Sequence, residues 1–454
     1  MVVQHNMQAM NANRMLGTTS NMQAKSTEKL SSGYKINRAA DDAAGLSISE
    51  KMRKQIRGLD QASTNAQDGI SAVQTAEGAL TEVHSMLQRM NELAVQASNG
   101  TNSESDRQSI QDEINQLTTE IDRVAETTKF NETYLLKGNG KSTTVQVGAK
   151  DAGMDGSMIG VGTGVATFKM DELKTGSSIS IGSKGYTIGT KISDVQGKVT
   201  SVGQKVNING TEYSVVTTTN EDENQYSVAD VKKLISDGDT VIIGTETFVA
   251  MTDATSDGIG DNDASVISAS HAYDLINAEL AKASSIGTDP GSEATVSHTA
   301  ATNGIVTFTI TEGTVQSTQG LQVGLHVGAD ADETNKISFT IDSMDSAGLG
   351  VKGLNIVDNT GAKATYAIDA IAAAVAKVSE QRSALGAVQN RLEHTIANLD
   401  NVVENTTSAE SQIRDTDMAE EMVNYSKNNI LAQAGQSMLA QANQSTQGVL
   451  SLLG

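Results

Sequence analysis

Histidines, carboxylates and hydroxyls could carry out chemistry in this chain, but their spacing matches no catalytic pattern. GxSxG and P-loop sequences are both absent, so the usual signatures of a serine hydrolase and of a nucleotide-binding loop are missing. No two histidines have the helical spacing that a zinc protease requires. We interpret each one as a surface or helix-seam residue, and we predict no enzyme. The six are His5, His84, His271, His298, His326 and His394.

Acidic residues gather in one glycine-containing loop whose carboxylates could hold calcium. The loop lacks the spacing and the terminal glutamate of an EF-hand, so we predict a solvated acidic loop rather than a metal site. These residues are Asp253, Asp257, Asp261 and Asp263. The adjacent pair Asp41 and Asp42 is better explained as charge at a helix start than as a catalytic dyad. We expect no cofactor and no metal.

The amino-acid composition excludes several classes of structure and of binding partner. The chain has 454 residues, 3% aromatic residues, no Trp and no Cys, which excludes disulfides and favours thin helical seams over one large core. The net charge is −22, and residues 151–320 hold 22 acidic against 9 basic side chains, a balance of −13. Without a basic cluster, nucleic acid is not an expected partner. No apolar run is long enough for a membrane helix. The acidity serves either solubility or, alternatively, an acidic binding face.

Helical seams occupy both ends of the chain. From Leu59 to Gly100, apolar or small residues recur every three or four positions, which predicts a coiled-coil helix. A second helix, capped by Ser103 or Ser105, should return antiparallel because the link is short. A third seam between Ile368 and Val403 is expected to complete the bundle. The two chain ends must therefore fold together, with the middle as an insertion.

The final segment carries two adjoining apolar rows. One monomer has too little chain to cover both rows, so either neighbouring subunits cover them or the helix is buried within its own monomer. The rows are Tyr425, Ala432, Leu439 and Leu453, and Leu431, Met438, Ala442 and Val449.

The middle of the chain, between about 140 and 365, favours strands. Residues 178–188, 206–216 and 241–251 each resemble a β-hairpin, and Asn209-Gly210 is a strong tight-turn signal. Helical stretches at Val228 to Ile235 and Val266 to Ala283 follow the second and third hairpins. Small hairpin-plus-helix units are therefore predicted.

Both ends also carry family-like motifs. LSSGYKINRAADDAAGLSISEKM (30–52) resembles the N-terminal signature of bacterial flagellins. LGAVQNRLEHTIANL (385–399), IRDTDMAEEM (413–422) and NNILAQAGQSMLAQANQ (428–444) resemble the paired C-terminal signature. The resemblance covers about residues 1–140 and 365–454, with a weaker likeness at 321–351.

The resemblance implies a structural subunit of the flagellar filament with an α+β fold. Residues 1–40 and 409–454 would form a terminal helical domain that lines the filament channel. Residues 41–150 and 318–408 would form a helical rod domain with a β-hairpin, and residues 151–317 a variable, surface-exposed, β-rich outer domain. The implied assembly residues are Leu30, Ile36, Asp41, Asp42, Leu431, Met438, Leu439, Val449 and Leu453.

The resemblance also implies partners and a location. The chain would form a homo-polymer, the extracellular filament of the bacterial flagellum. It would leave the cell unfolded through the flagellar type III apparatus, without a cleavable signal. An export chaperone would bind its C-terminal segment, and filament cap and hook-filament junction proteins would contact the polymer.

Residues 87–106 are similar to the surface that Toll-like receptor 5 recognises on many flagellins. Arg89, Leu93 and Glu113 fall on the matching positions. Asn91 departs from the basic residue that strongly stimulating flagellins often carry there. Alternatively, Leu93 belongs to the seam, and Arg89 and Glu113 serve only the packing of subunits.

Three other functions compete with this hypothesis. A hook-filament junction protein shares the terminal helices, although the C-terminal signature and large insertion favour a filament subunit. A glycan-binding adhesin would use exposed aromatic residues, and several aromatics of the middle lie on predicted hairpin cores. An enzyme would need a catalytic constellation in the insertion.

Overall fold

The chain folds into two compact units. The structure, a computed structural model, describes residues 6–451, with side chains described as far as residue 444. The first unit comprises Met1–Ser71, Gly324–Ser338 and Gln389–Gly454, and the second comprises Ala72–Val323 and Phe339–Val388. The predicted fold class is confirmed: long helices come from both chain ends, and the middle is rich in strands.

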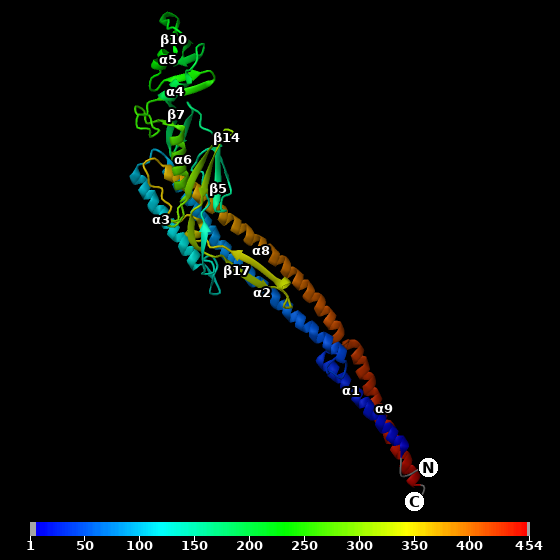
Figure 1. Ribbon diagram of the computed structural model, residues 1–454. Coiled ribbons are helices and arrows are strands. Elements are labelled where there is room, and N and C mark those ends of the chain that lie inside the picture. Colours follow the sequence, from blue (N-terminus) through cyan, green and yellow to red (C-terminus); the bar gives the residue numbers. More distant parts are fainter. Residues whose placement is uncertain (1–5, 452–454) are drawn as a thin grey trace. The chain divides into compact units, whose positions relative to one another are not determined.

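Long helices dominate both ends of the chain (Figure 1). Their bounds are α1 (Met7–Ser32), α2 (Ala43–Ser98), α3 (Glu104–Thr127), α8 (Ala362–Arg414) and α9 (Met418–Ser451). Helix α2 ends where the sequence predicts but begins well before Leu59. The carboxylate of Asp42 accepts a hydrogen bond from the N–H of Gly45 at 2.9 Å, which satisfies a free donor of the first turn.

In the second unit, α3 returns antiparallel to α2 as predicted. Ser103 is its N-cap and forms a capping box with Asp106, which satisfies free N–H groups at the helix start. The side chain of Arg89 on α2 meets that of Glu113 on α3 at 2.9 Å. Helix α8 contacts α2 through Arg382 and Glu77, at 3.7 Å. The three seams therefore form the predicted bundle.

A buried arginine closes the end of α2. Arg107 is 1% exposed. Its guanidinium donates to the carbonyl oxygens of Ala97 at 2.8 Å, Asn99 at 3.2 Å and Asp358 at 3.0 Å. The last carbonyls of a helix have no partner within the helix, so this cation caps α2 and ties it to a distant loop.

The predicted hairpins are confirmed. At the second hairpin, Asn209 and Gly210 have φ of 50° and 87°, the left-handed values that a tight turn between twisted strands requires. The hairpins are β6 (Ser178–Ile181) with β7 (Lys184–Lys191), β8 (Lys205–Ile208) with β9 (Thr211–Val216), and β11 (Thr240–Ile243) with β12 (Glu246–Met251).

These hairpins share one eight-stranded sheet. The order is β10-β9-β8-β11-β12-β7-β13, with β6 pairing with β7. Strands β10 (Gln225–Ser227) and β13 (Val266–Ser268) lie at its ends. The associated helices are α4 (Ile192–Lys198), α5 (Val228–Leu234) and α6 (Ala269–Ser284). The sequence did not predict α4.

The predicted helix at Val266 was placed too early. Val266 and Ile267 pair in parallel with Thr187 and Ile188 of β7. Helix α6 begins at Ala269, because the Ser268 hydroxyl accepts from the N–H of His271 at 3.2 Å and so caps it. The two β-branched residues therefore join the sheet.

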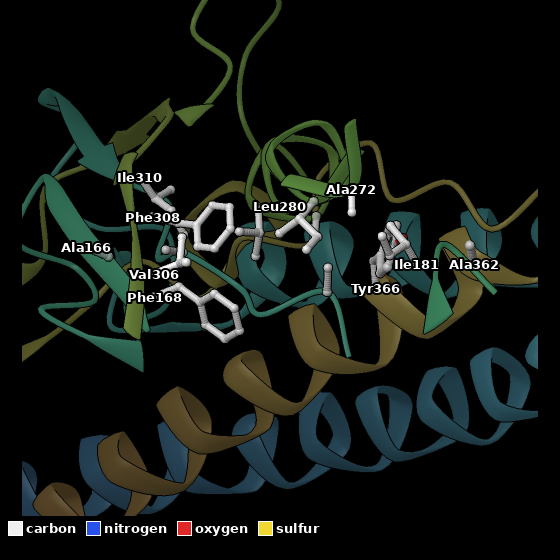
Figure 2. Close-up of a cluster of buried hydrophobic side chains, with 14 of the residues drawn as sticks. Ala166, Phe168, Ile181, Ala272, Leu280, Val306, Phe308, Ile310, Ala362 and Tyr366 are labelled. Atoms are coloured by element: carbon white, nitrogen blue, oxygen red, sulfur yellow. The ribbon is translucent and has the colours of Figure 1, made fainter. Parts of the chain in front are cut away.

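Strands distant in sequence close the insertion. One sheet has the order β14-β15-β5-β4, and β16 pairs with β3. Figure 2 shows Phe168, Phe308 and Leu280 in the buried cluster that this sheet shares with α6. The strands are β3 (Ser142–Gln146), β4 (Ser157–Ile159), β5 (Val165–Asp171), β14 (Thr295–Thr302), β15 (Ile305–Thr311) and β16 (Thr314–Thr318).

In the first unit, the part of a further strand pair that lies within residues 324–338 packs on α2. Asn65 donates its side-chain amide to the carbonyl of His326 at 2.9 Å, and a Cβ at Gly69 would collide with Leu325. Glycine therefore lets this hairpin, formed by β17 (Leu321–His326) and β18 (Lys336–Ile341), approach the helix closely.

The remaining elements are short. They are β1 (Lys129–Phe130), β2 (Thr133–Tyr134), α7 (Ser346–Leu349), and the 3₁₀ turns Glu221–Glu223 and Glu333–Asn335.

Candidate assembly interface

Helices α1 and α9 lie side by side (Figure 1), and most of their described side chains are exposed or only partly buried. Only Ser26 of α1 is buried among its described residues. Neighbouring exposed apolar residues on a protein surface mark an interaction site. The exposed apolar residues of the pair are Met7, Met10, Met15, Met22, Met418, Met422, Val423, Ile430, Leu431 and Met438.

The two rows predicted for α9 differ in exposure. In the first row, Tyr425, Ala432 and Leu439 are partly buried. In the second, Leu431 is 45% exposed and Met438 60% exposed. The monomer thus covers one row better than the other. The side chain of Val449 and the whole of Leu453 lie outside the described residues.

An apolar groove runs between the two helices. Its volume is about 750 Å³, and Met15, Leu16, Leu431 and Met438 are among its lining residues. Gly435 faces it, and a Cβ there would lie 3.3 Å from the Leu16 side chain. The groove therefore continues the exposed face of α9 onto α1.

A compact joint connects this helix pair to α2 and α8. We define the joint as residues 33–42 and 414–417, where α1 gives way to α2 and α8 to α9. The N–H of Lys35 donates to the carbonyl of Arg414 at 2.7 Å, and the N–H of Thr416 donates to that of Gly33 at 3.0 Å. The chain's two ends are thus joined by main-chain hydrogen bonds, which fix their register.

Arg414 is the hub of the joint. Its guanidinium lies 4.8 Å from the centre of the Tyr34 ring and 2.8 Å from the carboxylate of Glu50. It also contacts the hydroxyl of Ser49 at 3.3 Å. A partly buried arginine that stacks on an aromatic ring and pairs with a carboxylate holds its neighbours in one geometry.

Four predicted assembly residues lie in or beside this joint. Leu30 is half-buried, and Ile36 is 3% exposed. The carboxylate of Asp41 accepts from the N–H of Arg38 at 2.9 Å. This bond lowers the pKa of Asp41, helped by the N–H of Asn37 and the charges of Lys25 and Lys29. Asp42 caps α2. Within the monomer these residues shape the joint.

The predicted receptor-recognition residues do not share one environment. Arg89 is half exposed and bonds to both Glu113 at 2.9 Å and Glu92 at 3.1 Å. The carboxylate of Glu113 raises the pKa of Arg89. Asn91 is partly exposed, whereas Leu93 is 2% exposed and belongs to the seam.

The prediction of a solvated acidic loop holds for Asp257, Asp261 and Asp263, which are exposed, and is wrong for Asp253. The side chain of Asp253 has no exposed area and pairs with Lys191 at 3.1 Å. Its carboxylate also accepts from the N–H of Gly258 at 3.1 Å, because the loop folds back around it.

Within residues 6–451, no three histidine, cysteine or carboxylate side chains form a group that could hold a metal ion. No described helix has both the length and the apolar composition to cross a membrane.

Comparison with known proteins identifies the family. The model of the bacterial flagellin N-terminal helical region matches residues 3–141, and that of the C-terminal helical region matches residues 368–453. A flagellin of Clostridium tyrobutyricum is 43% identical over 451 residues, covering 98% of this chain and 100% of that protein. A flagellin of Bacillus subtilis is 36% identical over 456 residues, covering 100% of both. The chain belongs to the bacterial flagellin family.

A solved structure is also similar to this chain. FliC from Burkholderia pseudomallei is 21% identical, covers 71% of this chain and 99% of its own, and has a TM-score of 0.26. The family assignment rests on the sequence relationship. The chain is therefore a structural subunit that polymerises with copies of itself into the flagellar filament. As a flagellin it is a structural protein and not an enzyme.

Proposed function

We propose that this subunit polymerises through the apolar faces that α1 and α9 leave uncovered. The observation that carries the proposal is the exposure of Leu431 and Met438 on α9, beside an apolar groove shared with α1. Burying such side chains against a neighbouring subunit stabilises the contact by roughly 25 cal/mol for each Å² of apolar surface removed from water. Leu439, Val449 and Leu453 extend the same rows by their spacing, and Leu30 flanks the joint.

The proposal includes a division of labour along the chain. Residues 1–40 and 409–454 line the filament channel, residues 41–150 and 318–408 form the rod, and residues 151–317 form the surface-exposed outer domain. The terminal helices become ordered as they assemble, because only contact with neighbours covers their second face. Ile36, Asp41 and Asp42 support assembly indirectly, by shaping the joint from which α1 and α2 depart.

The partners follow from the same surfaces. An export chaperone covers the apolar rows of α9 before the chain leaves the cell through the type III apparatus, without a cleavable signal. Filament cap and hook-filament junction proteins meet the terminal helices at the ends of the polymer. Toll-like receptor 5 contacts Arg89, Asn91 and Glu113, while buried Leu93 holds the helix beneath them.

Seeded polymerisation tests this proposal. The purified chain and a truncated chain lacking Ser411 to Gly454 are incubated with filament seeds and examined by negative-stain microscopy. We expect filaments from the full-length chain alone. Filaments from both chains would show that α9 is dispensable and would overturn the proposed interface.

A further inference from the structure

A second apolar surface lies far along the chain from the terminal helices, at the tip of the β4–β5 hairpin. Three β-branched side chains are about half exposed there: Ile159 by 55%, Val161 by 49% and Val165 by 52%. Residues 156–168 contain no charged side chain, in a chain with a net charge of −22. Three exposed apolar residues close together on one hairpin differ from scattered single ones, which need no explanation.

A buried carboxylate holds this loop in one shape. Glu312 is 6% exposed, and it accepts hydrogen bonds from the N–H groups of Gly162 at 2.6 Å and Gly164 at 2.9 Å. It also accepts from the N–H of Ala149 at 3.1 Å. Charge-assisted bonds of this kind are strong. The loop is therefore pre-organised, and a partner need not spend free energy on ordering it.

A pocket of about 500 Å³ lies beside the loop. Val161, Met158 and Leu349 line it together with Lys150 and Asp369. One oxygen of Asp369 is buried. Burial raises the pKa of Asp369 to about 6; the charge of Asp151 and a hydrogen bond to its carboxyl group act in the same direction, and the charge of Lys150 opposes them. The pocket thus combines apolar walls with two neighbouring carboxyl groups, Asp151 and Asp369, and the ammonium group of Lys150.

We propose that the β4–β5 tip and this pocket form a contact site for a second copy of the chain in the filament. Two acidic copies repel one another over most of their surface, and the uncharged tip is a place where they can approach closely. An open polymer needs unlike surfaces that meet head to tail. The neighbouring copy buries Val161 and covers the pocket beside it. The proposal rests on polymerisation but not on the role of α1 and α9.

Thiol labelling tests this contact, since the natural chain contains no cysteine. Val161→Cys is copolymerised with an excess of unaltered chain, so that filaments form even if the variant alone assembles poorly. Val202→Cys is the matched control, because Val202 is 57% exposed on another turn. Maleimide labelling rates are measured for both variants, as monomer and as filament.

The proposal predicts that filament formation slows labelling at position 161 by about tenfold or more relative to position 202, as expected for a side chain at the dry centre of an interface. An unchanged ratio in filaments overturns the contact while leaving the filament itself established. Slow labelling at position 161 in the monomer also overturns it, because something other than a neighbouring copy would then cover the tip.

Discussion

The helix pair α1 and α9 differs from the strand-rich middle in where its apolar side chains are covered. The middle buries its apolar residues within the chain: Phe168, Phe308 and Ile310 are all fully buried. The helix pair instead exposes methionines and branched residues along its length. A region that covers its own core folds alone, whereas a region that exposes an apolar face is completed by neighbours.

Methionine enrichment on the exposed pair has a physical use. Its unbranched, polarisable side chain adapts to irregular neighbouring surfaces. Subunits of a helical polymer contact several neighbours at once, and adaptable side chains suit such contacts. The fully buried phenylalanines of the middle instead require one fixed packing arrangement.

The largest expected effect comes from placing charge on the exposed face of α9. Leu431→Asp combined with Met438→Asp should abolish polymerisation, because two carboxylates would be buried without partners at the subunit contact. The monomer should keep its helix content, since both side chains are exposed. Sedimentation and circular dichroism measure the two outcomes. Val202→Asp serves as the control. Normal filaments from the double variant would show that this face of α9 does not contact a neighbouring subunit.

A smaller effect, confined to the other region, is expected from the core. Phe308→Ala should lower the free energy of unfolding of the strand-rich middle by roughly 3–5 kcal/mol, because it removes a fully buried ring and leaves a cavity. Filaments should still form at low temperature. Denaturant unfolding followed by near-ultraviolet circular dichroism checks this. If the variant failed to assemble under conditions in which its strand-rich middle is still folded, the packing of the middle and the assembly of the helix pair would be coupled.

The pH dependence of stability separates the regions further. Burial raises the pKa of Asp369 to about 6, from 3.8, so the folded chain holds a proton there that the unfolded chain loses. The free energy of unfolding should therefore fall as pH rises from about 4 to 6. Asp369→Asn should flatten this slope. Denaturant midpoints across the pH range test it, and an unchanged slope in the variant would contradict the assignment.

Lys150 should act in a second pH window. Burial lowers its pKa from 10.5 to about 8, so in this window the unfolded chain holds a proton that the folded chain has released. The free energy of unfolding should rise between about pH 8 and 10.5. Lys150→Met should remove that rise. A slope that persists in this variant would have to come from another group.

The smallest expected effect concerns the joint. Asp42→Ala removes the side-chain acceptor for the N–H of Gly45 and should lower the free energy of unfolding by about 1 kcal/mol, as for other N-caps. Asp42→Asn, which keeps the acceptor, should cost less. Equal losses in the two variants would show that charge, rather than capping, matters at this position.

Local chemistry explains what could be predicted from the sequence. The hairpin at Asn209 and Gly210 was predictable because two adjacent residues that tolerate positive φ specify a turn by themselves. The helices were predictable from their apolar period, and Ser103 from its place before the first helical turn. Each of these signals lies within a few residues of the element that it specifies.

Long-range contacts explain the rest. The pairing of β5 with β15 joins residues more than a hundred positions apart, with no local signal for the partner. The buried carboxylate of Asp253 pairs with Lys191, and the guanidinium of Arg107 donates to the carbonyl of Asp358. Leu93 was placed beside the seam by its spacing, but its near-complete burial depends on elements packed around α2. Such partners become visible only once the fold brings them together.

Amide hydrogen exchange in monomer and filament tests the comparison most directly. We predict that amides of α1 and α9 exchange quickly in the monomer and slowly in the filament, because neighbours complete their packing. Amides of β5 and β15, which the chain already buries, should exchange at similar rates in both states. Equal protection of α1 and α9 in monomer and filament would contradict the claim that assembly completes their fold.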